Sequence, residues 1–554
     1  MGAAIVNGIE VELADGEKLN CVQAAQRAGV EIPTYCWHPA LTVVASCRMC
    51  LVEIGEKKAD GTIAMQPKVV PACQTPAKAG TVIVTNSERA KAAQAGTLEY
   101  ILLDHPLDCP VCDQAGECYL QDYSYKFGNA ESRLNEPKTY HPDKHYIGEQ
   151  IVLYTDRCVM CSRCVRFTRE ISGTGELQVI NRGNHAEIDI FPGQPCNNKL
   201  AGNVVDICPV GALCSKDFLY KQRVWWLQSA PSVCPNCSTG CSINVDHNDD
   251  RVYRLKPRYN PEAQGHFMCD LGRFGFKYTH RDDRMQSPIL RSHTGNGAMA
   301  TWEETLEDVR RKLGSFAPAV VGVLSPWMTV EEGYLTASFL KSLSKNVRLA
   351  MGPIPTDGED DVYPKGPDGT PHGKTTFTIR AEKCPNRKGV EAVLDHFEGE
   401  IRSFESALED VDARRVAAAF VVGGYNFNWV SESAVKSLSK LSYLAVMDIL
   451  PNSLTDAAHV VLPGASFAEK EGVFVNANGL AQQIKPAIKP LGDARTDARI
   501  LMHLAGRLGL YHPPTLRKEI AAAIPMFACL ASGDLGEFGA KIGVQQPQAV
   551  GAGV

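Results

Sequence analysis

Cysteine is the residue type whose number and spacing in this chain point to chemistry. The 554-residue sequence holds 20 cysteines, of which 18 stand at or before Cys269. Secreted disulfide scaffolds are short chains that carry an export signal. This chain is long, and its N-terminus lacks the charged-then-apolar layout of such a signal. The cysteines are therefore expected to be metal ligands in the reducing cytosol.

The first set of candidate ligands combines one close pair with two distant cysteines. Its members are Cys36, Cys47, Cys50 and Cys73, separated by 10, 2 and 22 residues. Each iron of a [2Fe–2S] cluster needs two thiolates, and this set supplies four. The alternative is a structural zinc ion, but zinc favours two close pairs and only Cys47 and Cys50 form one. The spacing therefore predicts a [2Fe–2S] cluster.

The second set places a histidine beside compactly spaced cysteines. Its members are His105, Cys109, Cys112 and Cys118, separated by 3, 2 and 5 residues. The cysteine spacing predicts a [4Fe–4S] cluster whose fourth ligand is a ring nitrogen of His105. The alternative is that His105 is an ordinary surface or core residue. A neutral imidazole in place of a thiolate removes one negative charge, which alone raises the reduction potential, although hydrogen bonds to the ligands can reverse this.

The third set has the C-x2-C-x2-C spacing of bacterial ferredoxins. Its members are Cys158, Cys161, Cys164 and Cys208. In two-cluster ferredoxins the cysteine before proline serves the other cluster. Here no second C-x2-C-x2-C run exists, so Cys208, which precedes Pro209, is expected to complete the same [4Fe–4S] cluster. Cys196 and Cys214 compete for that role, but neither precedes proline.

The fourth set supplies thiolates for another [4Fe–4S] cluster. Its members are Cys234, Cys237, Cys241 and Cys269. A structural zinc ion is a stronger alternative here than for the first set, because the spacing alone also suits zinc. The four sets together use 15 cysteines and one histidine, for one [2Fe–2S] and three [4Fe–4S] clusters. The remaining cysteines are interpreted as ordinary packed residues: Cys21, Cys196, Cys214, Cys384 and Cys529.

The secondary-structure pattern expected for the segments that position these ligands differs along the chain. Residues 1–85 open on a hairpin signal at Asn7-Gly8, continue with helical spacing that stops near Gly29, and end in further β-rich runs, which together suggest a β-grasp domain. Residues 86–146 have a helical pattern. Short elements alternate around cysteines over 147–225, and 226–282 form another small cysteine-bearing module.

Residues 283–554 are typical of an α/β domain. Buried strands are expected over 319–324, 417–422, 444–447 and 459–462, and an amphipathic helix over 302–313. The Gly/Pro/Asp-rich stretch 351–375 is expected to be a surface insertion. The Gly-rich segment after Val422 lacks a G-x-G-x-x-G pattern, so no flavin or nicotinamide site is expected.

Composition excludes two further classes of protein. The net charge is −6, whereas nucleic-acid binders usually carry a basic footprint. No stretch approaches 18 consecutive apolar residues, so no membrane span is expected.

The four motifs, in this order, resemble those of a known family, the large iron–sulfur subunit of respiratory complex I, the proton-pumping NADH:quinone oxidoreductase. Besides the His105–Cys118 motif, the matching segments are 33–39, 46–53, 71–76, 156–167, 202–213 and 461–479. The likeness is tight through residue 282 and patchy between about 290 and 415. The presence of the fourth set resembles bacterial members that keep an extra cluster off the electron path, whereas the mitochondrial pattern lacks it.

The resemblance implies a multidomain α+β and α/β fold in five parts. These are a β-grasp [2Fe–2S] domain over 1–85, a helical [4Fe–4S] domain with one His and three Cys ligands over 86–146, a ferredoxin-like [4Fe–4S] domain over 147–225, a four-cysteine [4Fe–4S] module over 226–282, and a shortened molybdopterin-oxidoreductase-like domain over 283–554. The last is expected to bind no molybdopterin.

The resemblance also implies a subunit of an enzyme, NADH:quinone oxidoreductase, that transfers electrons and contains no catalytic residue of its own. Single electrons would come from a flavin (FMN)- and NADH-binding subunit, pass through the first three clusters, and leave toward other iron–sulfur and quinone-site subunits. The subunit is expected to lie in the peripheral arm of the complex, on the cytoplasmic side of a bacterial inner membrane.

Two other functions share part of this pattern. An iron–sulfur subunit of a soluble NAD-linked hydrogenase or formate dehydrogenase could share the front half. However, the 285 residues after Cys269 are too few for a complete molybdopterin-binding region, which a formate dehydrogenase would need. Hydrogenase diaphorase subunits typically resemble only the cysteine-rich N-terminal half of this chain. A zinc-binding scaffold is the remote alternative.

Overall fold

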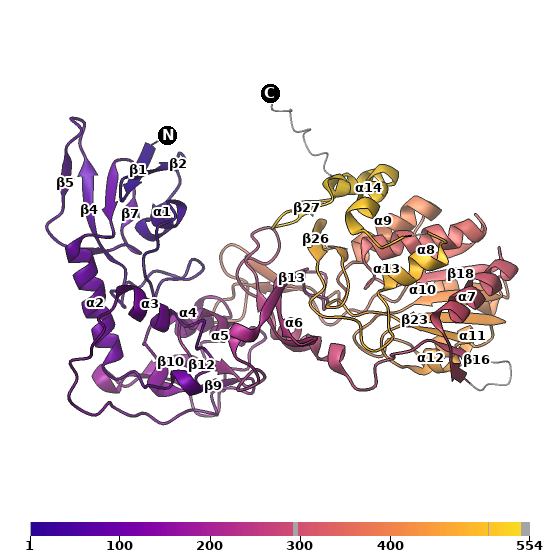
Figure 1. Ribbon diagram of the computed structural model, residues 1–554, viewed down its shortest axis with the longest axis horizontal. Helices are drawn as coiled ribbons and strands as arrows, with labels where there is room; N and C mark the ends of the chain where they lie inside the picture. The colour runs from indigo at the N-terminus through magenta and orange to yellow at the C-terminus, as the bar shows by residue number, and fades with distance from the viewer. Residues whose placement is uncertain (1, 292–296, 508, 544–554) are drawn as a thin grey trace. The chain divides into compact units, whose positions relative to one another are not determined.

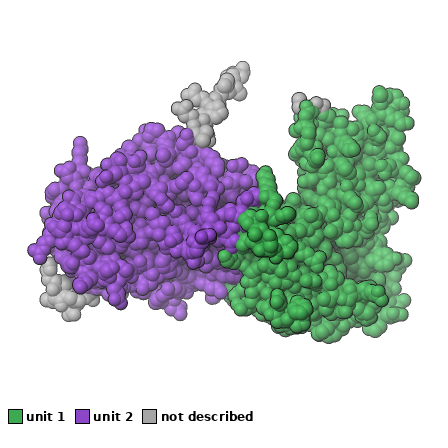
Figure 2. Space-filling model, turned by 180° about the vertical axis from the view of Figure 1, so that it is seen from behind, with its two compact units in different colours: residues 1–227, 363–374 green, residues 228–362, 375–554 purple. Residues whose placement is uncertain are grey.

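The chain folds into two compact units. The computed structural model describes residues 2–291, 297–507 and 509–543. Unit 1 comprises residues 1–227 and 363–374, and unit 2 comprises 228–362 and 375–554 (Figure 2). No helix among the described residues is long and apolar enough to cross a membrane.

Unit 1 begins with a mixed sheet around a short helix (Figure 1). Its elements are β1 (Gly2–Val6), β2 (Ile9–Leu13), β3 (Leu19–Asn20), α1 (Cys21–Arg27), β4 (Leu51–Lys57), β5 (Ile63–Met65), β6 (Val70–Pro71), β7 (Pro76–Ala77) and β8 (Thr81–Val84). The strand order is β2-β1-β8-β4-β5, with β1 and β8 parallel. Asn7 and Gly8 both have positive φ in the β1–β2 turn, which confirms the expected hairpin. Cys21 is buried in this core, as expected.

The rest of unit 1 consists of helices and short strands that are connected by loops. They are α2 (Glu88–Leu102), α3 (Tyr119–Phe127), β9 (Ile151–Leu153), α4 (Arg163–Glu170), β10 (Leu177–Ile180), β11 (Glu187–Ile190), α5 (Asn203–Ile207) and β12 (Leu213–Ser215). The helical pattern expected over 86–146 is wrong beyond α3, because residues 128–146 contain no helix. Pro137 and Pro142 each lack the backbone donor that a helix interior needs.

The stretch 351–375 is only partly the surface insertion that its composition predicts. Residues 363–374 belong to unit 1. The Lys365 amide donates to the Ile171 carbonyl at 2.9 Å, and a Cβ added at Gly173 would lie 2.4 Å from the Gly366 carbonyl oxygen. The glycine therefore permits a close backbone approach between segments far apart in the sequence.

Unit 2 is built on a seven-stranded sheet covered on both faces by helices (Figure 1). In spatial order its strands are β17 (Gly297–Met299), β16 (Ile289–Arg291), β24 (Val460–Pro463), β23 (Tyr443–Asp448), β22 (Ala418–Val422), β18 (Val320–Leu324) and β19 (Arg348–Met351). The last five are parallel. Helices on both faces bury both sides of each strand, which is why the sequence shows continuous apolar runs there. The four expected strands are thereby confirmed.

Two sets of helices form the two faces. One face packs against α7 (Trp302–Phe316), α8 (Val330–Leu343), α9 (Arg387–Glu398), α13 (Asp497–Leu504) and α14 (Pro513–Ala523). The other packs against α10 (Phe404–Asp412), α11 (Glu432–Leu438) and α12 (Ser453–Ala457). The expected helix α7 begins with a capping box, in which Thr301 and Glu304 satisfy each other's backbone N–H groups.

Smaller elements complete unit 2. They are an antiparallel sheet of β13 (Gln228–Val233), β14 (Ser242–Asn248) and β15 (Arg251–Pro257), the short helix α6 (Asp270–Phe274), and a second antiparallel sheet of β25 (Gly472–Val475), β26 (Leu480–Ile484) and β27 (Ala540–Lys541). The strand β20 (Asp361–Tyr363) lies in the Gly/Pro/Asp-rich stretch and pairs with β21 (Phe377–Ile379), which follows that stretch.

Candidate iron–sulfur sites

The first ligand set is brought together on loops of the β-grasp sheet. Cys47 and Cys50 flank a turn in which Arg48 has φ 57°, Cys50 directly precedes β4, and Cys73 follows β6. Hydrogen bonds from the thiols of Cys47 and Cys73 lower the pKa of Cys36, and a hydrogen bond from Cys73 lowers the pKa of Cys50. The four thiols are therefore linked by close contacts, Cys47 to Cys36, Cys36 to Cys73 and Cys73 to Cys50.

The second set surrounds one cavity. Its lining includes all four members of the set, namely His105, Cys109, Cys112 and Cys118. Cys118 caps the N-terminus of α3. Burial raises the pKa of the Cys118 thiol to about 11, against the backbone N–H groups of Gln121 and Leu120, which lower it.

His105 is held in its neutral form. Burial, aided by the positive charges of Lys138 and Arg157, lowers the pKa of its imidazole to about 4, and Asp108 opposes this shift. At neutral pH the ring therefore carries a free lone pair, which is the form of histidine that binds metals.

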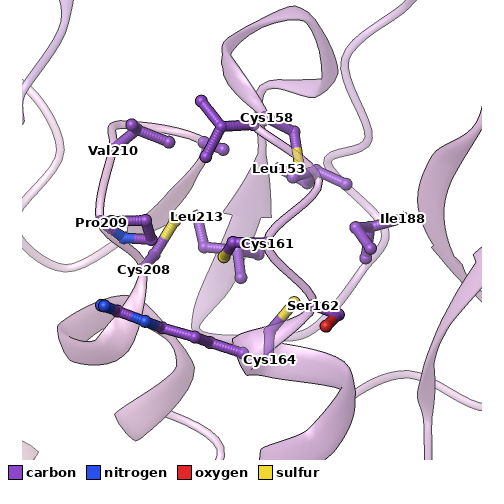
Figure 3. Close-up of a pocket in the computed structure, with 13 residues that line it drawn as sticks. Leu153, Cys158, Cys161, Ser162, Cys164, Ile188, Cys208, Pro209, Val210 and Leu213 are labelled. Atoms are coloured by element: carbon purple, nitrogen blue, oxygen red, sulfur yellow. The ribbon is translucent and has the colours of Figure 1, made fainter. Parts of the chain in front are cut away.

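The third set lines a second, apolar cavity (Figure 3). Cys158, Cys161, Cys164 and Cys208 all contribute to it, together with aliphatic side chains that include Leu153, Ile188 and Leu213. Met160 and Ser162 have φ 49° and 59°, so the C-x2-C-x2-C run coils tightly before α4 begins.

Backbone N–H donors surround the sulfur of Cys208. Burial raises the pKa of its thiol, while the backbone N–H groups of Leu213, Val210 and Ala212 donate to its sulfur and lower it. Such N–H···S bonds stabilise a negatively charged sulfur in an environment from which water is excluded.

The two competing cysteines lie elsewhere. Cys196 and Cys214 do not line the third cavity. Cys214 packs in β12 against Val152 and Tyr154. Its thiol lies close enough to Cys112 and Cys208 for both to raise its pKa, after the larger effect of burial.

The fourth set lies in unit 2, between β13 and β14 and at the start of α6. Cys234 follows β13, Cys241 precedes β14, and the Cys269 sulfur accepts from the Gly272 amide at 3.4 Å as the N-cap of α6. A Cβ at Gly272 would lie 2.9 Å from the Cys234 sulfur and 3.5 Å from the Cys269 sulfur.

Burial and the three other thiols raise the pKa of Cys241 well above its ordinary value. The four sulfurs of the fourth set are therefore buried and lie close to one another.

Buried arginines beside the ligands were missed by the sequence reasoning. The Arg157 guanidinium lines the second cavity, pairs with Asp108 at 2.9 Å and lies 4.0 Å from the centre of the Tyr154 ring. Arg163 lines the third cavity. The Nη1 atom of Arg157 and the Nε atom of Arg163 are buried without a hydrogen-bond partner among the described residues. The available signal was the position of each arginine directly before a motif cysteine.

The residues present fit iron–sulfur clusters. Thiols line two cavities, backbone amides point at sulfur, and unpartnered guanidinium donors lie beside the cavities. Unpartnered buried donors are costly unless a bound group accepts from them. Among the described residues, no three His, Cys, Asp or Glu side chains have the arrangement that holds a single metal ion.

Five family models match the chain in order. They are a 2Fe-2S iron-sulfur cluster binding domain (residues 4–88), the NADH-ubiquinone oxidoreductase-G iron-sulfur binding region (94–133), the ferredoxin-like domain of NADH-quinone oxidoreductase subunit 3 (148–214), the molybdopterin oxidoreductase Fe4S4 domain (227–281) and molybdopterin oxidoreductase (400–507). These matches and the ligand sets define an iron–sulfur protein with a 2Fe–2S site and several 4Fe–4S regions.

Relatives extend over nearly the whole chain. An NADH-quinone oxidoreductase subunit of Rickettsia conorii is 28% identical over 95% of this chain and 91% of the relative. The mitochondrial NADH dehydrogenase [ubiquinone] iron-sulfur protein 1 of Solanum tuberosum is 29% identical over 92% and 80%. The chain is therefore similar over nearly its whole length to large iron–sulfur subunits of NADH:quinone oxidoreductases.

Among solved structures, an NAD+-reducing [NiFe]-hydrogenase in the H2-reduced state is similar. It is 24% identical, with a TM-score of 0.34, and covers 40% of this chain and 91% of its own.

Proposed function

We propose that this chain is the electron-transfer subunit of a complex I, relaying single electrons from a flavin-bearing, NADH-oxidising subunit toward quinone. The observation that carries the proposal is that three ligand sets of different type lie within one compact unit, with their loops in mutual contact. When bound, iron–sulfur clusters would supply one-electron chemistry with little change in shape; the protein fixes their ligation, spacing and surroundings.

The proposed ligands are the sixteen residues named from the sequence. They are Cys36, Cys47, Cys50 and Cys73 for a [2Fe–2S] cluster, and His105, Cys109, Cys112 and Cys118; Cys158, Cys161, Cys164 and Cys208; and Cys234, Cys237, Cys241 and Cys269 for three [4Fe–4S] clusters. The convergence of each set supports this assignment. The proposed domains keep the boundaries 1–85, 86–146, 147–225, 226–282 and 283–554.

Contacts between ligand loops support an order of sites that differs from their order in the sequence. Arg166 of α4 donates to the carbonyl oxygen of Cys36 in the first set and, at 3.4 Å, to that of Cys161 in the third. Its side chain is buried, so this bridge is shielded from water. The third site therefore neighbours the first.

The third site also neighbours the second. A Cβ added at Gly211, three residues after Cys208, would lie 2.1 Å from the Cys112 sulfur. The Tyr119 amide, directly after Cys118, donates to the Pro209 carbonyl at 3.0 Å. The segment 208–213 thus forms a wall common to both sites, and electrons would pass from the first site to the third and then to the second.

The remaining assignments follow the family. We propose that the chain joins a flavin- and NADH-binding subunit and further iron–sulfur and quinone-site subunits in the peripheral arm, on the cytoplasmic side of a bacterial inner membrane. The fourth set lies in unit 2, and we assign it to a position off the main path.

The proposal is tested in the assembled complex, isolated anaerobically from membranes. Cys161→Ala should abolish NADH–quinone activity while NADH–ferricyanide activity, which needs only the flavin subunit, stays within about twofold. The matched control is Cys384→Ala, which removes a buried cysteine of unit 2 outside the ligand sets and should leave both activities unchanged. Full NADH–quinone activity in assembled Cys161→Ala complex would contradict the proposal.

A further inference from the structure

Arg163 lies where the ligand loops of all three sites of unit 1 meet. Its Nη2 donates to the Trp37 carbonyl at 2.6 Å and its Nη1 to the Ile207 carbonyl at 3.2 Å. Its guanidinium carbon lies 5.9 Å from the centre of the Tyr119 ring. The residue itself is only 5% exposed.

Each of these contacts is one residue away from a proposed ligand. Trp37 follows Cys36 of the first set, Tyr119 follows Cys118 of the second, and Ile207 precedes Cys208 of the third. Arg163 directly precedes Cys164 and lines the third cavity. One side chain therefore contacts the neighbours of ligands from three sets that are widely separated in the sequence.

The charge of Arg163 is not neutralised by the protein. Its hydrogen-bond acceptors are neutral carbonyls, and no carboxylate among the described residues forms an ion pair with it. Its Nε is buried and has no partner in the same part of the chain. A buried cation without a counter-ion is strongly unfavourable. Because the folded chain buries Arg163 in this way, we infer that an anionic group binds beside it.

The charge of Arg163 lies beside the third set. Arg163 lines the same cavity as Cys158, Cys161, Cys164 and Cys208. Its guanidinium is therefore a positive charge next to four proposed thiolate ligands.

We propose that Arg163 is a positioning residue for electron transfer that makes the third cluster easier to reduce than its ligands alone would allow. Its Nε–H donates to a sulfur of that cluster. Its Nη2 and Nη1 atoms, hydrogen-bonded to Trp37 and Ile207, fix the loops that carry Cys36 and Cys208. Added negative charge on the cluster is stabilised by the uncompensated cation. The inference rests on the proposed function.

The first test measures the reduced-to-oxidised ratio of the third cluster by EPR at fixed potentials in the assembled complex. Arg163→Gln removes the charge and should lower that ratio about tenfold, a downward shift of about 59 mV for one electron. Arg163→Lys keeps the charge and should stay within about threefold of the wild type. The control Arg169→Gln, at an exposed position of the same helix, should change nothing.

The outcomes separate a charge effect from a structural one. A ratio in Arg163→Gln equal to that of the wild type overturns the proposal. Equal losses in Arg163→Gln and Arg163→Lys also overturn it, because a purely structural role would affect both alike.

A second test uses the wild-type sequence, in case Arg163→Gln fails to assemble the third cluster. Pulsed EPR of the reduced third cluster, in complex labelled with guanidinium-¹⁵N arginine, should show a ¹⁵N coupling that is lost in Arg163→Lys. Absence of the coupling in the wild type overturns the proposed Nε–H···S bond. Absence of any cluster signal in the wild type would instead contradict the proposed function itself.

Discussion

Two buried arginines beside the ligand loops of unit 1 differ from the buried cations in the sheet domain of unit 2. In unit 1, Arg163 and Arg166 donate to backbone carbonyls beside the ligand cysteines and form no ion pair within the described part of the chain. Two other buried cations of unit 1 are paired, Lys144 with Glu187 and Asp189 and Arg157 with Asp108. In unit 2, the buried cations are matched by carboxylates: Arg284 with Glu469, Lys470 with Glu332 and Asp497, and Arg517 with Glu331.

This difference indicates what each unit is built to hold. Unit 1 leaves positive charge beside cavities lined by thiols, which suits anionic iron–sulfur clusters. The sheet domain of unit 2 satisfies its buried charges internally, so its ion pairs stabilise the chain's own fold. The contrast separates the ligand loops of unit 1 from a sheet domain in unit 2 that is organised around its own core.

The largest expected effect concerns the wall between the second and third sites. Gly211→Ala would place a methyl group 2.1 Å from the Cys112 sulfur, closer than any real contact. We expect the EPR signal of the second cluster to fall to less than about a tenth of its wild-type intensity, with the first cluster retained. Gly96→Ala, where a Cβ in α2 meets nothing within 4 Å, is the control. A full second-cluster signal in Gly211→Ala would disprove the common wall.

In unit 2, Lys470→Met should be severely destabilising. It leaves Glu332 and Asp497 buried without their cation, and breaking such a pair costs about 3–5 kcal/mol. Hydrogen exchange of α8 peptides should report this loss, while the cluster signals of unit 1 persist. Lys489→Met, which removes an 85%-exposed lysine, should cost less than about 0.5 kcal/mol. Unchanged exchange in α8 would show that the matched charges do not stabilise unit 2.

The same group of charges predicts a pH dependence. One lysine cannot balance two carboxylates, and burial raises the pKa of Glu332 to about 7. A raised carboxyl pKa contributes stability that is complete below the unfolded pKa, 4.5, and lost as pH rises through 7.

From pH 5 to pH 8, α8 in the wild type should therefore lose up to about 3 kcal/mol of opening free energy. Glu332→Gln should lack this loss, whereas the exposed Glu303→Gln should keep it. Identical pH profiles in the wild type and Glu332→Gln would refute the assignment.

The smallest effect is expected at a cysteine outside the ligand sets. Cys196 is buried but does not line the third cavity, so Cys196→Ala should cost about 1 kcal/mol of stability and leave every cluster signal intact. Loss of the third cluster in this variant would mean that Cys196, and not Cys208, completes the set.

The grouping of the third set around one cavity could be predicted from the sequence because most of that motif is local. Cys158, Cys161 and Cys164 lie on one tight turn, so their spacing alone indicates a shared site. The hairpin at Asn7-Gly8 and the apolar strand runs of unit 2 were predictable for the same reason, since each depends on short-range periodicity or turn geometry.

The features that sequence reasoning missed depend on long-range contacts. Arg163 reaches Trp37, 126 residues away, and its acceptors are backbone carbonyls, which carry no side-chain signal. Residues 363–374 join unit 1 through backbone contacts with Ile171 and Gly173. The order of the three sites likewise follows from packing, not from the order of the motifs.

The central claim is that this chain holds four iron–sulfur clusters. Its most direct test is iron and acid-labile sulfide analysis of anaerobically purified full-length protein, together with EPR after dithionite reduction. The account predicts about fourteen iron atoms and as many sulfides per chain, with one [2Fe–2S] and several [4Fe–4S] signals. A colourless protein that contains zinc and no acid-labile sulfide would contradict it.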